Sequence, residues 1–115
     1  MTRGDVILCR FPHAAGTPAK LRPALVVQSD YYNSRIANLL VAGITTNMAN
    51  AADKAHYLVD VTSADGKQSG LSSNSLVSCI NLAVLPPRAV DRAIGRLSAS
   101  AMQHIDECLK AAMGL

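Results

Sequence analysis

Apolar residues along most of the chain come in short runs that end at Pro, Gly, Ser or Asp, which is typical of β-strands. In Asp5–Phe11 the apolar residues occupy both alternating faces, which predicts a strand buried on both sides. Pro12 ends this run, and the Gly and Pro residues of 13–20 predict a loop. Pro23 then opens a second predicted strand, Ala24–Gln28.

The middle of the chain continues in the same way. Further strands are predicted at Leu39–Thr45, at Tyr57–Val61, at Ser75–Leu85 (one long or two short strands) and at Ala93–Leu97, where a helical turn fits nearly as well. Polar and small residues predict a turn or one helical turn at Ser29–Asn33, a loop at Asn47–Asp53 and turns through Ser63–Asn74.

The last 18 residues have a different periodicity. Their apolar positions are spaced by threes and fours, which predicts one amphipathic helix: Ala101, Met102, Ile105, Cys108, Leu109 and Ala112. Ser100 with Gln103 fits a capping box, Ser98 is an alternative cap, and Gly114 stands where a helix stop belongs. With no internal repeat and no linker, residues 1–115 predict a single domain of mainly β (α+β) class. Its expected architecture is a small half-barrel of five to seven strands with a C-terminal helix.

Composition narrows the class of protein. Half of the residues are hydrophobic and 17% are charged, which is typical of a folded domain and excludes a disordered chain. Three cysteines without close spacing build neither a disulfide framework nor a zinc site, and they predict buried thiols in a reducing cytosol. Asp5 and Arg10 interrupt any signal-like run, and Leu39–Ile44 is too short to span a bilayer, so we expect a cytoplasmic protein without membrane contact. The net charge of +3 permits a polyanionic partner.

Several segments, in order and spacing, resemble the MazF/PemK (Kid)-type toxins of toxin–antitoxin pairs. They are 3–8 (Arg-Gly-Asp-Val-Ile-Leu), 21–30 (Leu-Arg-Pro-Ala-Leu-Val-Val-Gln-Ser-Asp), 41–45 (Val-Ala-Gly-Ile-Thr), 70–77, and 94–97 followed by the final helix. The resemblance covers nearly the whole chain. It implies an SH3-like barrel that forms a homodimer, cleaves single-stranded RNA such as mRNA without a metal or other cofactor, and is silenced by a cognate antitoxin.

The resemblance also implies site residues, with Arg22 and Thr45 as the catalytic pair. A guanidinium can neutralise the two negative oxygens of a phosphorane with a bidentate fork, and Pro23 holds Arg22 in an extended conformation. A threonine hydroxyl can donate to a phosphate oxygen or orient the 2′-OH. Residue type and position suggest five further acid/base or RNA-binding residues: His13, Thr17, Lys20, Thr46 and Ser75. No clustered carboxylates or Cys/His ligands suggest a metal.

Other readings of the same residues stay open. Lys20, Arg22 and Arg35 could form a basic patch, with Tyr31 or Tyr32 stacking on bases or instead packing the turn. Plasmid-type relatives carry an Arg and an Asp where this chain has Ser78 and Ile80, so that acid/base pair is absent. The alternative function is a non-catalytic barrel that binds nucleic acid or a protein target, as gyrase poisons do. The lack of the Trp-containing tail of those poisons argues against gyrase.

Overall fold

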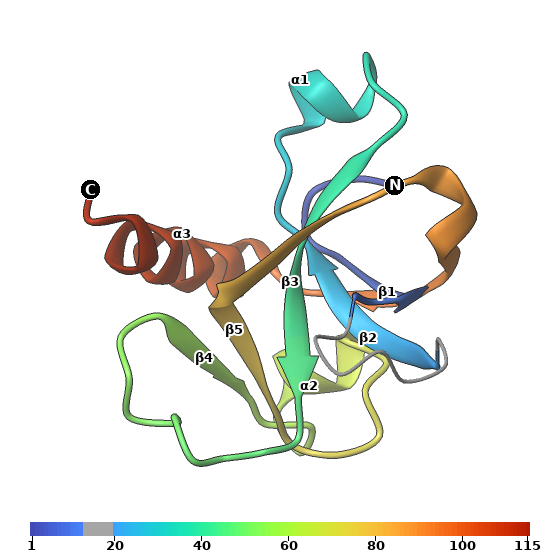
Figure 1. The fold of residues 1–115 in the computed structure, drawn as a ribbon. Coiled ribbons are helices and arrows are strands. Elements are labelled where there is room, and N and C mark those ends of the chain that lie inside the picture. Colours follow the sequence, from blue (N-terminus) through green and yellow to red (C-terminus); the bar gives the residue numbers. More distant parts are fainter. Residues whose placement is uncertain (13–19) are drawn as a thin grey trace.

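The computed structural model describes residues 1–12 and 20–115, and these residues fold as one bent antiparallel sheet with the C-terminal helix packed on one of its faces (Figure 1). The strands are β1 (Asp5–Arg10), β2 (Leu21–Val26), β3 (Leu39–Thr45), β4 (His56–Val59), β5 (Ser75–Leu85) and β6 (Val90–Arg96). The helices are α1 (Asp30–Asn33), α2 (Ala64–Gln68), the 3-10 turn η1 (Pro87–Ala89) and α3 (Ala99–Met113).

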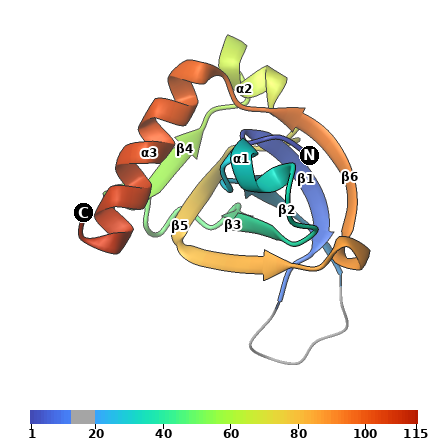
Figure 2. The same cartoon turned by 90° about the horizontal axis from the view of Figure 1, so that it is seen from above.

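The six described strands follow the order β4-β5-β3-β2-β1-β6, and every neighbouring pair is antiparallel. Seen from above, β5 and β6 curve around the sheet and α3 lies along its outer side beside β4 (Figure 2). This confirms the predicted mainly β fold with a closing C-terminal helix. Among residues 1–12 and 20–115, no helix combines the length and hydropathy that crossing a bilayer requires.

Two predicted strand starts were wrong by three residues each. β2 begins at Leu21, three residues before the predicted start, and therefore contains Pro23. The missing N–H of Pro23 is tolerated there because β3 pairs with β2 only from Ala24 onward. β6 also begins three residues before its predicted start, at Val90, because it pairs with β1 over that length. The segment from Ala93, for which both a strand and a helical turn were predicted, is therefore a strand.

The segment predicted only to turn after β4 contains the short helix α2. Ser63 caps it by accepting a hydrogen bond from the N–H of Gly66 at 2.9 Å. Gly66 packs directly on the carbonyl of Asp60, where a Cβ atom has no room. The helix therefore depends on a glycine that the sequence pattern reads as a turn signal.

Helix α3 has the predicted buried face but a different cap. The side-chain oxygen of Ser98, and not that of Ser100, accepts the N–H of Ala101 at 3.0 Å. Gly114 ends the helix in the left-handed region at a φ of 72°, as expected of a C-terminal stop. The residues buried on this helix are Ala101, Met102, Ile105 and Cys108.

The two faces of the sheet contribute to separate apolar clusters. One cluster joins the buried face of α3 to one side of the sheet, including Val6, Leu25 and Val77. The other cluster lies on the opposite side and includes Ile7, Ala24 and Val41. Because side chains alternate along a strand, Arg22 and Thr45 continue this second side toward the sheet end.

All three cysteine thiols are buried, as the sequence predicts. Burial raises the pKa of Cys9 to about 11 and that of Cys79 to about 12, and it also raises the pKa of Cys108. Because only the thiolate is strongly nucleophilic, these side chains are chemically inert in the folded protein.

We therefore expect the native protein to react slowly with a thiol reagent such as DTNB at pH 8, and all three thiols to react rapidly in guanidinium chloride. Absorbance of the released thionitrobenzoate measures both reactions. Rapid stoichiometric labelling of any cysteine in the native protein contradicts the packing described here.

Candidate nucleic-acid groove and its phosphate-facing residues

A hollow of about 470 Å³ opens where β2 begins and β3 ends, and we refer to it as the groove. Five of the seven predicted site residues line it: Lys20, Arg22, Thr45, Thr46 and Ser75. The other two, His13 and Thr17, lie outside the described residues. Residues from three separate strands and from the segment before β2 therefore meet at one place, as the resemblance implies.

Strand register brings Arg22 and Thr45 together. Ala24 of β2 pairs with Gly43 of β3, so continuing the antiparallel register by two residues places Arg22 opposite Thr45. Side chains at such positions point to the same face of a sheet. Consistent with this register, the Arg22 guanidinium and the Thr45 hydroxyl belong to residues that line the same hollow.

Arg22 is held by the backbone and left without an acidic partner. Arg22 pairs with Cys9 of β1, and the Cys9 thiol donates a hydrogen bond to the Arg22 carbonyl at 3.6 Å. No carboxylate within the described part of the chain forms an ion pair with Arg22. Its Nε atom is buried and has no hydrogen-bond partner among residues 1–12 and 20–115. A buried donor without a partner is costly, so this guanidinium is prepared to bind an anion.

The hydroxyl of Thr45 is oriented by its own loop. Its Oγ1 accepts the backbone N–H of Asn47 at 3.1 Å, which leaves the hydroxyl proton free to donate. Thr45 is exposed at the end of β3, as is Thr46 beside it. Ser75 is buried, and its hydroxyl already donates to the carbonyl of Ser73 at 2.9 Å. Thr45 is therefore better placed than Ser75 to donate to a ligand.

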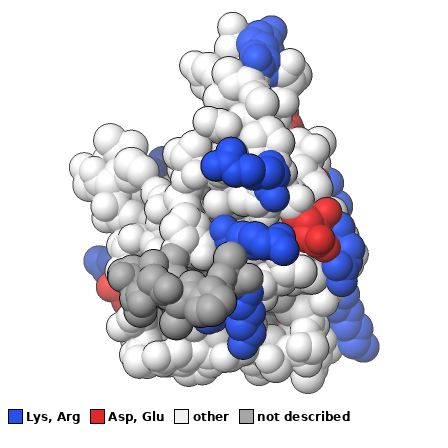
Figure 3. All heavy atoms as spheres, turned by 45° about the vertical axis from the view of Figure 1, so that its right-hand side comes forward, with Lys and Arg blue, Asp and Glu red and all other residues white. Residues whose placement is uncertain are grey.

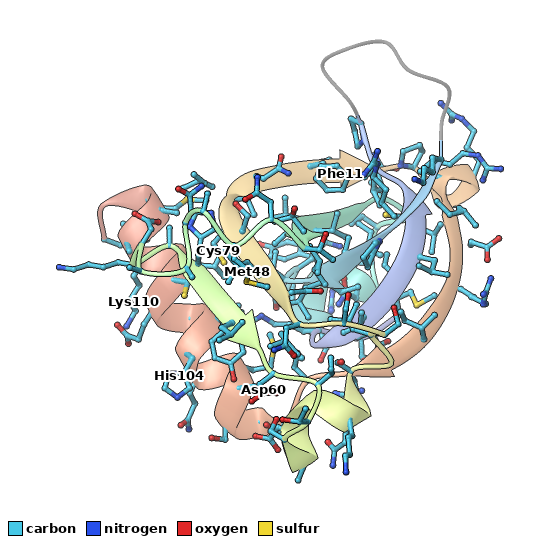
Figure 4. The ribbon with its side chains drawn as sticks, turned by 90° about the horizontal axis from the view of Figure 1, so that it is seen from below. Phe11, Met48, Asp60, Cys79, His104 and Lys110 are labelled. Carbon is cyan, nitrogen blue, oxygen red and sulfur yellow. The ribbon has the colours of Figure 1, made fainter. Side chains whose placement is uncertain are left out.

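Because Gly43 has no side chain, two residues that line the groove can pack against it. A Cβ atom at this position would lie 2.7 Å from Nδ2 of Asn81 and 3.2 Å from the ring of Phe11. Both side chains consequently pack across the β3 backbone, and Figure 4 shows Phe11 at the end of β1 on this side of the molecule. Asn81 was not among the predicted site residues, although it lines the groove.

Positive charge gathers on the neighbouring face. Figure 3 shows Lys and Arg side chains spread over the side of the molecule formed by β1, β2 and β6, with fewer acidic groups among them. Arg10, Arg88 and Arg92 are exposed there, at the end of β1, in η1 and in β6. Such a surface attracts a phosphate backbone along its length.

Arg35 does not belong to the predicted basic patch. It follows α1, beyond the opposite end of β2 from Arg22, and its guanidinium lies 3.6 Å from the ring centroid of Tyr31. Tyr31 and Tyr32 are both more than half exposed, and their rings contact each other at a centroid distance of 5.0 Å. Neither tyrosine lines the groove.

A second hollow of about 310 Å³ lies next to the groove and shares Thr45 and Asn81 with it. His56 and Ser78 line this second hollow. His56 Nε2 lies 3.0 Å from Ser78 Oγ, and His56 Nδ1 lies 2.8 Å from Asp53 Oδ2. His56 was not among the predicted site residues; its partner Ser78 is 22 residues away, and no local motif indicates their contact.

Metal ligands do not cluster in the described part of the chain: among residues 1–12 and 20–115, no group of three or more His, Cys, Asp or Glu side chains could hold an ion. The charges that line the groove are the cations of Lys20 and Arg22. Its chemistry is therefore that of an anion-binding surface with hydroxyl and amide donors.

This fold and groove correspond to one class of protein. Residues 2–113 match the family model described as PemK-like, MazF-like toxin of type II toxin–antitoxin systems, and the chain belongs to this toxin family. Among curated relatives, endoribonuclease MazF6 of Mycobacterium tuberculosis and endoribonuclease MazF2 of Mycobacterium bovis are each 33% identical over 105 residues. Each alignment covers 90% of this chain and 88% of the relative.

Solved structures show the same fold. The Mycobacterium tuberculosis toxin MazF-mt6 superposes with a TM-score of 0.77 at 26% identity, over 96% of this chain and 97% of that one. A mycobacterial endoribonuclease in complex with its cognate antitoxin gives 0.78 at 20% identity, over 100% and 96%. A MazE–MazF structure from Deinococcus radiodurans gives 0.71 at 19% identity, over 100% and 97%.

Proposed function

We propose that this toxin is an endoribonuclease that cleaves single-stranded RNA, mRNA included, by attack of the ribose 2′-OH and without a metal ion. The proposal is supported by the curated relatives, which are named endoribonucleases. The single observation that carries it is the arrangement at Arg22: a guanidinium without an acidic partner in the described chain, with a buried unbonded Nε, opposite the Thr45 hydroxyl.

Arg22 serves the reaction by meeting charge that develops at phosphorus. Attack by the 2′-oxygen gives a phosphorane whose equatorial oxygens carry two negative charges, and a planar guanidinium binds two of them at once. Its donors are fixed in place before the reaction, so they need no reorganisation in the transition state. Thr45 adds one neutral hydrogen bond to the same group, while Lys20 and Thr46 bind the flanking backbone.

The nucleophile comes from the substrate. The 2′-OH adjacent to each RNA phosphate is tethered close to phosphorus and can align for in-line attack, which removes the entropy loss of bringing in a second reactant. The products are a 2′,3′-cyclic phosphate, or its opened form, and a 5′-OH. This route requires neither a metal-bound water nor a protein nucleophile.

The toxin's partners follow from its family. We propose that a cognate antitoxin covers the groove with an acidic segment, since the groove and the neighbouring face are basic. We also propose that the toxin acts in the cytoplasm, where mRNA is its substrate. Each barrel is small, and a homodimer would join two grooves into one longer surface for RNA.

Arg22→Ala is expected to lower the rate of RNA cleavage a hundred- to thousandfold with the fold intact, which corresponds to about 2.7–4 kcal/mol of lost transition-state stabilisation. Arg22→Lys restores charge without the planar fork and recovers only part of the rate. Single-turnover cleavage of a labelled RNA measures these rates. Arg35→Ala, which removes a guanidinium remote from the groove, is the matched control and retains wild-type cleavage. Wild-type activity in folded Arg22→Ala excludes Arg22 from the mechanism.

Cleavage is expected to persist in EDTA and to require the 2′-OH at one position. An RNA with a single deoxy sugar on the 5′ side of the scissile phosphate should bind as tightly as the all-RNA substrate yet stay intact, because its nucleophile is missing. Gel electrophoresis reports cleavage, and fluorescence anisotropy reports binding. Cleavage of the deoxy-substituted substrate, or loss of activity in EDTA, overturns the proposed chemistry.

The toxin is expected to be a homodimer at micromolar concentration, with twice the mass of the 12.1 kDa chain. Multi-angle light scattering measures the mass directly. A stable particle of monomer mass across this concentration range contradicts the proposed assembly.

A further inference from the structure

The hydrogen bonds around His56 fix where its protons lie. An ionised carboxylate only accepts, so in the neutral ring Nδ1–H donates to Asp53 and Nε2 accepts the O–H of Ser78. The backbone N–H of Ala55 donates to the same Asp53 oxygen at 3.0 Å, which holds the carboxylate in position. The order serine, histidine, aspartate is the order of a proton relay, with the serine at the accepting end.

Asp53 is suited to stabilise a protonated ring. The hydrogen bond from His56, and after it the one from Ala55, lower the pKa of the Asp53 carboxyl below its ordinary value. The carboxylate therefore stays charged over a wide pH range. His56 is buried at 9% exposure, whereas the Asp53 side chain is 53% exposed, so the carboxylate acts on the imidazole mainly through their direct 2.8 Å hydrogen bond.

Sheet register places the relay on the face of the groove. Ser78 of β5 pairs with His56 of β4 on one side and with Gly43 of β3 on the other. Paired residues point to the same face, and Thr45 follows Gly43 by two positions, so it shares that face. The second hollow, which is lined in part by the largely buried Ser78 and His56, has Thr45 and Asn81 in common with the groove. A nucleotide whose phosphate lies at Arg22 can therefore extend its ribose toward Ser78.

We propose that Ser78 and His56 accept the proton of the attacking 2′-OH, with Asp53 as a positioning residue. This inference rests on the proposed ribonuclease function. The 2′-oxygen forms its bond to phosphorus while its proton passes to Ser78 Oγ, whose own proton passes to His56 Nε2. The bond between phosphorus and the 5′-oxygen breaks, and the departing oxygen takes a proton from water. His56 then returns its proton to water.

Other titratable groups lie near His56 on the side of α3, and their charges can affect how the cleavage rate depends on pH. Around the hollow between β4 and α3 they are Lys54, Tyr57, His104, Glu107, Cys108 and Lys110. Burial raises the pKa of Tyr57 and of Cys108, so both stay neutral near pH 7. His104 stacks on Tyr57 and lies on α3, outside both hollows that share Thr45 (Figure 4). It is therefore the matched histidine control.

His56→Gln is expected to lower single-turnover cleavage about a hundredfold or more, the usual contribution of a general base, while RNA affinity stays near wild type. The melting temperature falls because hydrogen bonds of a buried residue are lost, so the rates are compared at a temperature where circular dichroism shows both proteins folded. In the wild type the rate rises with pH and reaches a plateau once the ring is neutral. In His56→Gln the plateau disappears and the rate keeps rising with hydroxide concentration, because only hydroxide removes the proton. His104→Gln keeps the wild-type profile.

Ser78 variants test the accepting end without changing the histidine. Ser78→Ala should lose rate to a similar extent, and Ser78→Thr, which keeps a hydroxyl, should recover much of it. A substrate with sulfur in place of the bridging 5′-oxygen separates a base from an acid, because a thiolate leaves without being protonated. The His56→Gln defect should persist on this substrate.

The outcomes distinguish this inference from the proposed function. If wild-type protein cleaves RNA and Arg22→Ala does not, but folded His56→Gln keeps both the rate and the plateau, the relay is wrong and the ribonuclease stands. Rescue of His56→Gln by the 5′-thio substrate also overturns the proposal, because it makes His56 an acid. If wild-type protein cleaves no RNA, the proposed function fails and the relay fails with it.

Discussion

The arrangement of the site depends on a break in register between β3 and β5. Ala42 pairs with Leu82, but its neighbour Gly43 pairs with Ser78, so three residues of β5 lie opposite no residue of β3. β5 bends at this point. Its first part pairs with β4 on one side and with the end of β3 on the other, and its second part pairs with the beginning of β3. The same bend carries Asn81 across Gly43 and separates the groove from the second hollow.

The two faces of the sheet differ in what covers them, and this difference makes the site possible. One face buries its side chains under α3, where Ile105 is fully covered and supplies much of the apolar contact. The opposite face has no long helix against it in the described structure and holds a smaller apolar cluster that ends at the groove. Stability thus comes mainly from one side, which leaves polar and charged groups on the other side available for a ligand.

Polar groups at the site fall into two kinds. The exposed Asp53 in the loop before β4 and the buried His56 and Ser78 in the sheet are joined by hydrogen bonds, so they keep a fixed geometry without a ligand. Arg22 instead retains a buried donor that has no partner in the described part of the chain. An anion that completes the bonding of Arg22 recovers the free energy lost by desolvating that donor, and this gain is available only when a phosphate is bound.

The sequence by itself determined most of the strands and the closing helix, and family resemblance pointed to Arg22 and Thr45, which both line the groove. Alternation and helical spacing are local patterns, so they survive without knowledge of the fold. Only the tertiary structure decided that α2 forms against the backbone of Asp60, that Arg35 lies far from Arg22, and that His56 reaches Ser78. Those contacts join residues through strand register and close packing, and register is set by how the whole sheet bends rather than by any segment alone.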